Sequence, residues 1–254
     1  MDKVVIDKNK CIGCGECVRD CVSHHIALVD GHAEVLDNNC IECGHCYAIC
    51  PVGAVDMPGY DMTGLEDTAD IADFGSDKLL LALRSRRSRR RFTAEPVSDA
   101  DLERLLEAGR YSPTGSNRQD VQFVVLREKL AEAEALAVEE FCSSARLKSL
   151  LMNTNGEVDR QFFFKGAPLA IVCAGKRPLD PALAAAFVEL MAQGMGLGVF
   201  YSGYFSFAVQ RKAKLRELLG FPVGVDIVTT LVIGHSDVKY QRCVPRKPAN
   251  VIWR

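Results

Sequence analysis

The chain has 254 residues, of which 48% are hydrophobic and 25% charged, and its formal net charge is −2. This composition is typical of a globular protein with a buried core, and the length allows one or two domains. The near-neutral charge argues against nucleic-acid binding. The first residues lack the apolar run of a signal peptide, and the most apolar stretches are too short to span a bilayer. We therefore expect a cytoplasmic protein with no membrane or nucleic-acid partner.

Eight of the eleven cysteines lie within the first 50 residues, in two copies of one motif. The segment CIGCGECVRDC (11–21) recurs 29 residues later as CIECGHCYAIC (40–50). Each copy has the spacing C-x2-C-x2-C-x3-C, which holds cubane iron–sulfur clusters, the fourth cysteine of each run binding the other cluster. The motif therefore predicts one 4Fe-4S cluster on Cys11, Cys14, Cys17 and Cys50, and a second on Cys40, Cys43, Cys46 and Cys21.

Two zinc sites are the alternative interpretation of these cysteines. Zinc ligands usually come as two short motifs separated by a longer gap, which fits this spacing poorly. Residues 1–58 resemble the bacterial two-cluster 4Fe-4S ferredoxins. One departure stands out: Pro51 follows Cys50 as in that family, but Val22 follows Cys21, so the turn there is less constrained.

Two further features of the N-terminal part bear on its fold. Asp30-Gly31 lies between two apolar runs and predicts a hairpin with a type I′ turn. The segment 59–77 carries six acidic residues and no basic one, which is typical of a solvated connector. We therefore expect a first domain over residues 1–58 and an acidic linker over 59–77.

The segment RSRRSRRRF (84–92) has six arginines among its first eight residues. Three interpretations are open: a solvated basic face, a nucleic-acid patch, or a site for a cofactor phosphate. Guanidinium groups bind phosphate through paired, charge-assisted hydrogen bonds. Because the chain as a whole is not basic, the phosphate site is favoured over nucleic acid.

Residues 78–254 alternate between patterns of helix and strand. Ser98, with Asp101 three residues later, is typical of a helix N-terminus, and this helix should run to about Arg110. Strands are expected at 121–126, 168–174 and 225–234, and helices at 128–151, 181–196 and 207–220, the last ending at Gly220. Strands separated by helices predict an α/β or α+β sheet with helical cover.

Several segments of this second part occur in an order that resembles the nitroreductase family of FMN-dependent oxidoreductases. They are RRSRRRF (86–92), EPV (95–97), YSPTGSNRQDVQFVVL (111–126), GLGVFYSG (196–203), IGHS (233–236) and PRKP (245–248). The resemblance covers residues 78–254. It implies a central, largely antiparallel sheet surrounded by helices, and a homodimer with FMN at its interface. The expected fold class is therefore α+β, with a ferredoxin-like domain followed by a nitroreductase-like, FMN-binding domain.

The same resemblance implies roles for individual residues. The FMN phosphate and ribityl chain would be held by Arg86, Ser88 and Arg90, with Arg87 contributing mainly through its backbone and Arg246 as a second phosphate-binding position. A loop that reaches the FMN of the partner subunit would comprise Ser112, Pro113, Thr114 and Asn117. The backbone of Gly203 would approach the flavin ring, where a side chain would be in the way. No catalytic side chain is assigned, because the flavin carries the chemistry.

These elements together predict an enzyme. Single electrons would pass through the two clusters to FMN, which would reduce a small-molecule acceptor such as a nitroaromatic or a quinone. Ferredoxin and NAD(P)H are the candidate donors. Two alternatives stay open: NAD(P)H could reduce FMN, with electrons leaving through the clusters to a protein partner, or the chain could be a non-catalytic, redox-responsive binding protein.

Overall fold

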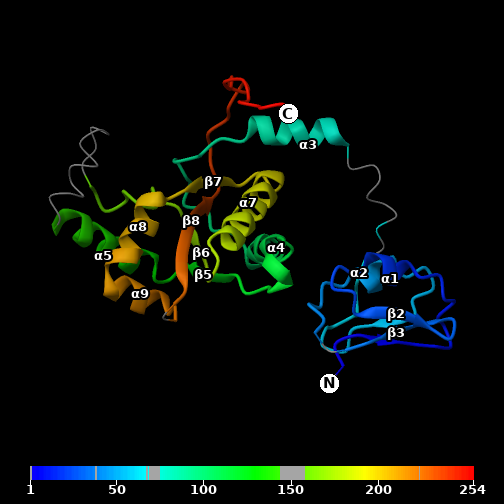
Figure 1. The fold of residues 1–254 in the computed structure, drawn as a ribbon. Coiled ribbons are helices and arrows are strands. Elements are labelled where there is room, and N and C mark those ends of the chain that lie inside the picture. Colours follow the sequence, from blue (N-terminus) through cyan, green and yellow to red (C-terminus); the bar gives the residue numbers. More distant parts are fainter. Residues whose placement is uncertain (1, 38, 67, 69–74, 144–157, 223) are drawn as a thin grey trace. The chain divides into compact units, whose positions relative to one another are not determined.

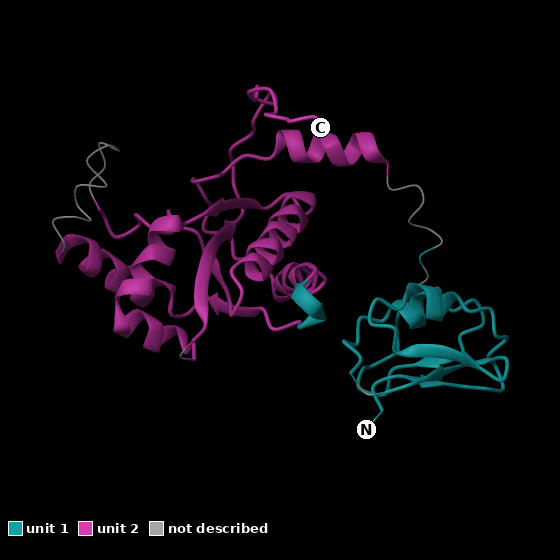
Figure 2. Cartoon of the chain, viewed as in Figure 1, with its two compact units in different colours: residues 1–73, 114–118 teal, residues 74–113, 119–254 magenta. Residues whose placement is uncertain are grey.

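The computed structural model describes residues 2–37, 39–66, 68, 75–143, 158–222 and 224–254. Its contacts divide the chain into two compact units, one of residues 1–73 with 114–118 and the other of residues 74–113 with 119–254 (Figure 2). Part of the expected linker 59–77 lies outside the described residues. Its last two residues, Ser76 and Asp77, belong to a helix.

In its described residues before position 69, the first unit has two small antiparallel sheets and two short helices (Figure 1), and the segment 114–118 adds one 3-10 turn, Gly115–Asn117. Strand β1 (Val5–Ile6) pairs with β4 (Val55–Asp56), and β2 (Ile26–Val29) pairs with β3 (His32–Val35). Helices α1 (Glu16–Asp20) and α2 (His45–Ile49) each lie inside one cysteine motif. Both follow a glycine, Gly15 or Gly44, with a φ of 75°, a conformation that lets the chain turn sharply between cysteines.

The hairpin between the two cysteine motifs has the expected turn. Asp30 has a φ of 49° and Gly31 a φ of 83°, and Val29 pairs directly with His32. These are the features of a two-residue type I′ turn, so this prediction is confirmed. The turn also lies against the first cysteine loop, because a Cβ on Gly13 would be only 2.1 Å from the carbonyl oxygen of Gly31.

The second unit is built on a sheet in the order β5-β6-β8-β7, with every neighbouring pair antiparallel. Its strands are β5 (Gln122–Leu126), β6 (Leu169–Gly175), β7 (Gly198–Tyr201) and β8 (Asp226–Gly234). Three of these match the expected strands. Beside β7 runs the arginine segment, where Ser88 forms a parallel bridge with Val199 and the Arg89 N–H donates to the Val199 carbonyl oxygen at 2.9 Å.

Helices cover both faces of this sheet (Figure 1). All seven residues of β6 are buried, and the first six alternate between two hydrophobic clusters. One face packs against α5 (Leu130–Ser143), α8 (Gly203–Arg211) and α9 (Ala213–Leu219). The other packs against α4 (Asp99–Arg110) and α7 (Leu179–Gly194). The unit is thus a three-layer α+β structure, as expected.

Helix boundaries confirm some predictions and correct others. The Ser98 side chain accepts a hydrogen bond from the Asp101 N–H at 3.0 Å, and Gly220, with a φ of 66°, ends α9. A single helix over 207–220 is wrong, because Lys212 is extended (φ −100°, ψ 111°) and separates α8 from α9. The helix expected at 128–151 is described as far as residue 143, and its remainder lies outside the described residues.

Helix α3 (Ser76–Ser85) has no buried residue, and the segment 235–254 that follows β8 is largely exposed. Within the described part of the chain, no helix is both long and apolar enough to cross a bilayer.

Candidate functional site

The structure gathers the eight N-terminal cysteines into two groups of four. One small cavity is lined by Cys11, Cys14, Cys17 and Cys50. A second is lined by Cys21, Cys40, Cys43 and Cys46. Each group takes three cysteines from one motif and the last cysteine from the other motif.

Backbone N–H groups point at the sulfur atoms of these cavities. The N–H of Ala33 donates to Cys11 Sγ and that of Ala54 to Cys50 Sγ, each at 3.3 Å. In the second group, Glu42 N–H donates to Cys40 Sγ at 3.3 Å and His25 N–H to Cys21 Sγ at 3.4 Å. Such bonds stabilise thiolates and tune the potential of an iron–sulfur cluster.

The innermost cysteine of each group lies in apolar surroundings. Burial raises the pKa of the Cys46 thiol to about 11, and burial also raises the pKa of Cys17. A thiol with a raised pKa would act as a metal ligand only after losing its proton.

The distances between donor groups bear on the zinc alternative. Across the described ranges, no three His, Cys, Asp or Glu side chains lie close enough together to hold a single metal ion. Cysteines that bind a cubane surround a larger inorganic core and stand farther apart than the four ligands of a zinc ion.

A cavity of about 630 Å³ opens in the second unit, where β7 ends and α8 begins. Its charged lining residues are the cations Arg90 and Lys165, and its lining includes no carboxylate. Its aromatic lining residues are Phe162, Phe163, Phe200, Tyr201, Tyr204 and Phe207. Aromatic rings with a few cations are suited to a planar ligand that carries negative charge.

Gly203 is the first residue of α8 and lies on the wall of this cavity. A Cβ built on it would meet no heavy atom within 4 Å, so there is open space beside this wall residue. The preceding residue, Ser202, is held firmly: its N–H donates to Thr230 O and its hydroxyl donates to Phe163 O, both at 2.8 Å. Rigid backbone beside open space allows a ring to approach closely.

The arginine segment does not form one patch, because its side chains diverge. Arg86 Nη1 pairs with Glu189 Oε1 at 2.7 Å, and Arg90 lies over the Phe200 ring, 5.8 Å from its centroid. Two other arginines contact the C-terminal segment. Arg91 Nε pairs with Asp237 at 3.1 Å, and Arg89 lies 5.9 Å from the centroid of the Tyr240 ring.

Other expected cofactor residues have unused hydrogen-bonding capacity. Arg87 Nε and Ser112 Oγ are buried and have no partner among the described residues. Each of these two groups is a donor that an acceptor oxygen of a ligand would satisfy. Arg246 lies exposed in the C-terminal segment, outside the lining of the aromatic cavity.

The loop expected to reach a partner subunit is divided between the two units. Ser112 and Pro113 belong to the second unit, whereas Thr114 and Asn117 belong to the first. Within the first unit, Asn117 Nδ2 donates to the carbonyl oxygen of Glu42 at 2.7 Å.

Sequence reasoning missed two buried carboxylates beside the aromatic cavity. Glu134 Oε1 accepts the N–H groups of Phe163 at 2.8 Å and Phe164 at 3.0 Å, and burial raises the pKa of Glu134. Glu189 bonds Arg86 and Tyr201. The available signal for Glu189 was a single acid in the middle of the apolar segment PALAAAFVELMAQG.

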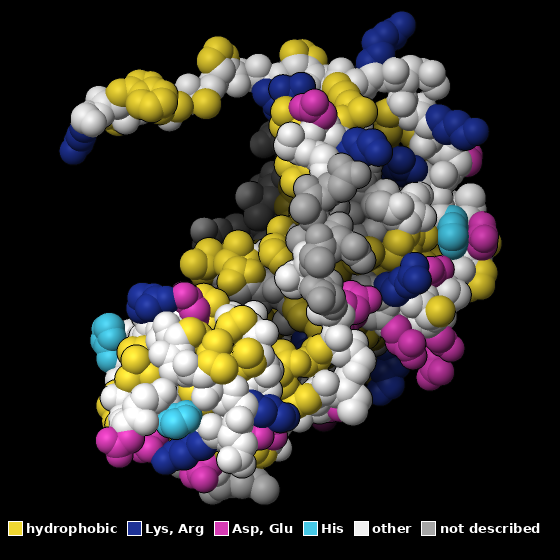
Figure 3. Space-filling model, turned by 90° about the vertical axis from the view of Figure 1, so that its right-hand side faces the viewer, with side chains coloured by type: hydrophobic (Ala, Val, Ile, Leu, Met, Phe, Trp, Pro, Cys, Tyr) yellow, Lys and Arg dark blue, Asp and Glu magenta, His cyan; other side chains and the backbone are white. Residues whose placement is uncertain are grey.

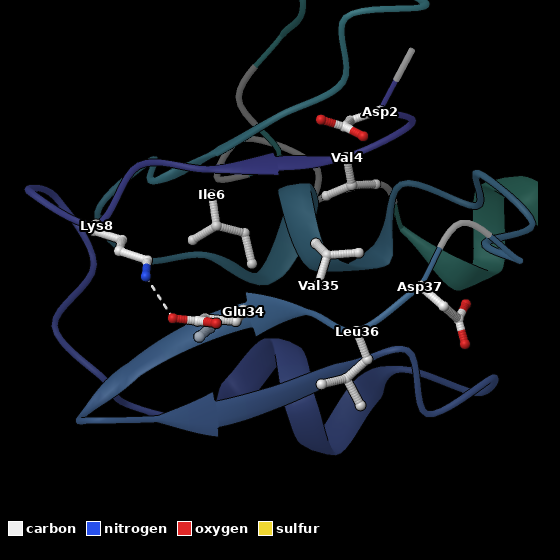
Figure 4. A pocket seen from close by; sticks show the side chains of 9 residues that line it. Asp2, Val4, Ile6, Lys8, Glu34, Val35, Leu36 and Asp37 are labelled. Carbon is white, nitrogen blue, oxygen red and sulfur yellow. Dashed lines mark hydrogen bonds and ion pairs between the residues drawn. The ribbon is translucent and has the colours of Figure 1, made fainter.

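A groove of about 480 Å³ in the first unit lies between β1 and β3. Figure 4 shows Lys8 paired with Glu34 at one end and Asp37 at the other. Its walls are mainly the aliphatic side chains of Val4, Ile6 and Val35, with no cysteine or histidine. Its one amine, on Lys8, is paired with Glu34, and among the described residues the groove holds no set of metal ligands.

Each of the two units contains a segment that matches a known protein family. Residues 3–51 match the model of a 4Fe-4S dicluster domain, and residues 83–235 match that of the nitroreductase family. The chain is similar to an NADPH-flavin oxidoreductase of Vibrio harveyi, with 27% identity over 176 residues that cover 65% of this chain and 68% of that protein.

Solved structures give the same result. An FMN-bound nitroreductase from Desulfitobacterium hafniense has 26% identity and a TM-score of 0.56, over 68% of this chain and 97% of that one. An FMN-bound nitroreductase from Bacteroides fragilis shares the fold, with 18% identity and a TM-score of 0.59, over 69% of this chain and 97% of that one. The chain therefore belongs to the nitroreductase family of oxidoreductases and carries a 4Fe-4S dicluster domain ahead of its nitroreductase domain.

Proposed function

We propose that this protein is an FMN-dependent oxidoreductase in which two 4Fe-4S clusters exchange single electrons with the flavin and a small organic molecule is reduced. The observation that carries this proposal is the cavity at Gly203, which has six aromatic rings, two cations and no carboxylate in its lining. The FMN in the Desulfitobacterium hafniense relative supports the identity of the cofactor.

Residues of the second unit fit such a cofactor. Aromatic side chains would pack against its ring, and the open space at Gly203 would admit the ring edge. Arg90 and Lys165, which line the cavity, would balance negative charge. Arg87 Nε and Ser112 Oγ lie outside the cavity lining and are two further donors at positions that the family resemblance assigns to cofactor binding. Bound FMN would supply transfer of one or two electrons, while the protein binds it, orients it and shields it from water.

The two cysteine groups of the first unit would hold the clusters. Their backbone N–H donors would stabilise negative charge on the sulfur ligands. A unit of this kind passes electrons and makes no bonds, so the reduced organic molecule would bind in the aromatic cavity.

We further propose that electrons enter through the clusters. NAD(P)H is the competing donor, and the NADPH-flavin oxidoreductase from Vibrio harveyi favours it as a second candidate. Anaerobic mixing separates the two. Reduced ferredoxin should bleach the flavin absorbance rapidly in the first case, and NADPH should do so in the second. Bleaching by NADPH alone would refute the inward path.

We propose a homodimer for the second unit. Helix α3 exposes Leu79, Leu80, Leu81 and Leu83, and Trp253 in the C-terminal segment is 90% exposed. Figure 3 shows hydrophobic side chains (yellow) at the surface among charged ones. Exposed apolar area of this kind usually marks a protein interface. Light scattering after size-exclusion chromatography should give twice the mass of the chain, and a monomer mass would refute the proposal.

The cofactor assignment is tested by measuring the iron, sulfide and flavin content of protein purified without oxygen. We expect about eight irons and about eight sulfides per chain, from two cubanes, together with about one FMN. Full iron without flavin, even after reconstitution with FMN, would refute the flavin site and leave the redox-responsive binding protein as the better interpretation.

A further inference from the structure

Glu189 is a buried carboxylate that joins three separate segments of the second unit. It lies in the middle of α7 and is 7% exposed. Its Oε1 accepts a hydrogen bond from Arg86 Nη1 at 2.7 Å, and its Oε2 accepts one from the Tyr201 hydroxyl at 3.0 Å. Arg86 directly follows α3, and Tyr201 ends β7. Both carboxylate oxygens are therefore used, each by a different segment.

Packing alone does not call for an acid at this position. The neighbouring buried residues of α7, Ala185, Val188 and Ala192, are fully buried and apolar. A buried carboxylate is costly unless it is paired and hydrogen-bonded, and an apolar residue of similar size often stabilises a core equally well. We therefore attribute the acidic residue at position 189 to a role for its negative charge.

The position of Tyr201 connects this network to the cavity. Tyr201 lines the aromatic cavity while its hydroxyl donates to Glu189. Burial, followed by the nearby Glu189 charge, raises the pKa of Tyr201, so its hydroxyl stays protonated and keeps donating. Glu189 is thereby bonded through one oxygen to a residue of the cavity wall and through the other oxygen to Arg86.

We propose that Glu189 is a positioning residue that orients the Arg86 guanidinium for the anionic group of the cofactor. This inference rests on the proposed FMN site. A guanidinium has five N–H donors in a planar fork. The pair with Glu189 uses Arg86 Nη1, and the Arg86 side chain is 27% exposed, so its remaining donors are free to face a ligand. Holding a flexible arginine in place reduces the entropy lost when a phosphate binds.

The test compares FMN with riboflavin, which has the same ring and no phosphate. Full-length protein with its clusters in place is freed of flavin and titrated with each compound, following the fluorescence of the flavin. The variants are Glu189→Gln and Tyr201→Phe, and the matched control is Glu103→Gln, which changes an exposed acid on α4.

We expect Glu189→Gln to raise the Kd for FMN about tenfold and to change the Kd for riboflavin by less than about twofold, since charge-assisted bonds to phosphate are the ones affected. Tyr201→Phe should raise the Kd for FMN about threefold, because Glu189 then loses one of its two hydrogen-bond partners. Glu189→Asp should restore part of the FMN affinity, and Glu103→Gln should match the original protein.

The outcomes separate the inference from the function on which it rests. If the unaltered protein binds neither compound, the FMN site itself is refuted. If it binds FMN but Glu189→Gln weakens FMN and riboflavin equally, Glu189 serves the fold only and the inference is wrong. Tighter FMN binding by Glu189→Gln would also overturn it, because the carboxylate would then compete with the phosphate for Arg86.

Discussion

Replacement of Gly13 by alanine tests whether the first cysteine loop needs the hairpin turn against which it packs. Gly13 has a φ of 67°, and its Cβ would lie 2.1 Å from the Gly31 carbonyl oxygen. The left-handed conformation alone costs a non-glycine residue about 1–2 kcal/mol. Relief of the overlap requires backbone movement, which costs about another 1–3 kcal/mol. We therefore expect Gly13→Ala to lower the free energy of unfolding by about 2–5 kcal/mol.

Gly53→Ala is the matched control. Gly53 lies in the same unit with a φ of 59°, and its Cβ would meet nothing within 4 Å. Gly53→Ala should therefore show only the cost of placing a non-glycine residue in the left-handed conformation. Anaerobic urea unfolding, followed by the loss of cluster absorbance, measures both variants. Because m is about 1 kcal/mol/M for a small domain, the midpoint of Gly13→Ala should lie about 1–3 M below that of Gly53→Ala. Equal midpoints would refute the close packing of Gly13 on the turn.

Three further predictions concern the candidate sites and a helix cap. Gly203→Val should raise the Kd for FMN at least about tenfold, because the new side chain fills the space for the flavin ring. It should leave the thermal midpoint of the flavin-free protein nearly unchanged, since a Cβ at this position meets nothing within 4 Å. A large loss of stability would contradict this prediction. Cys50→Ala should remove about four of eight irons, and Mössbauer spectra should retain the cluster of the second cysteine group. Loss of that cluster instead would refute the grouping. Ser98→Ala removes the hydrogen bond to Asp101 N–H and should cost about 1 kcal/mol in denaturant unfolding, whereas an unchanged midpoint would show that the cap contributes nothing.

Elements with strong local signals were predictable from the sequence. The Asp30-Gly31 turn follows from backbone sterics, and the strands β6 and β8 follow from continuous apolar runs buried on both faces. Strand β7 was missed as an element because it is four residues long and begins with glycine. The break at Lys212 was missed because the apolar pattern continues through it, while the backbone is extended there.

The arginine segment shows where local sequence stops being informative. The sequence predicts a concentration of charge, but the direction of each side chain depends on residues far along the chain. Arg86 meets Glu189, 103 residues later, and Arg91 meets Asp237, 146 residues later. The roles assigned to Arg86, Arg90 and Gly203 by family resemblance stay predictions, although Arg90 and Gly203 share one cavity.

The crosswise grouping of the cysteines has a consequence for biogenesis. As the chain leaves the ribosome, the group that contains Cys21 is complete once Cys46 has emerged. The group that begins with Cys11 needs Cys50, four residues later, although three of its members were made first. The two groups are interlocked, so a nascent chain can complete the group that begins with Cys11 only after the group that contains Cys21. If iron were delivered during synthesis, the group that contains Cys21 would be the first with all four of its cysteines available.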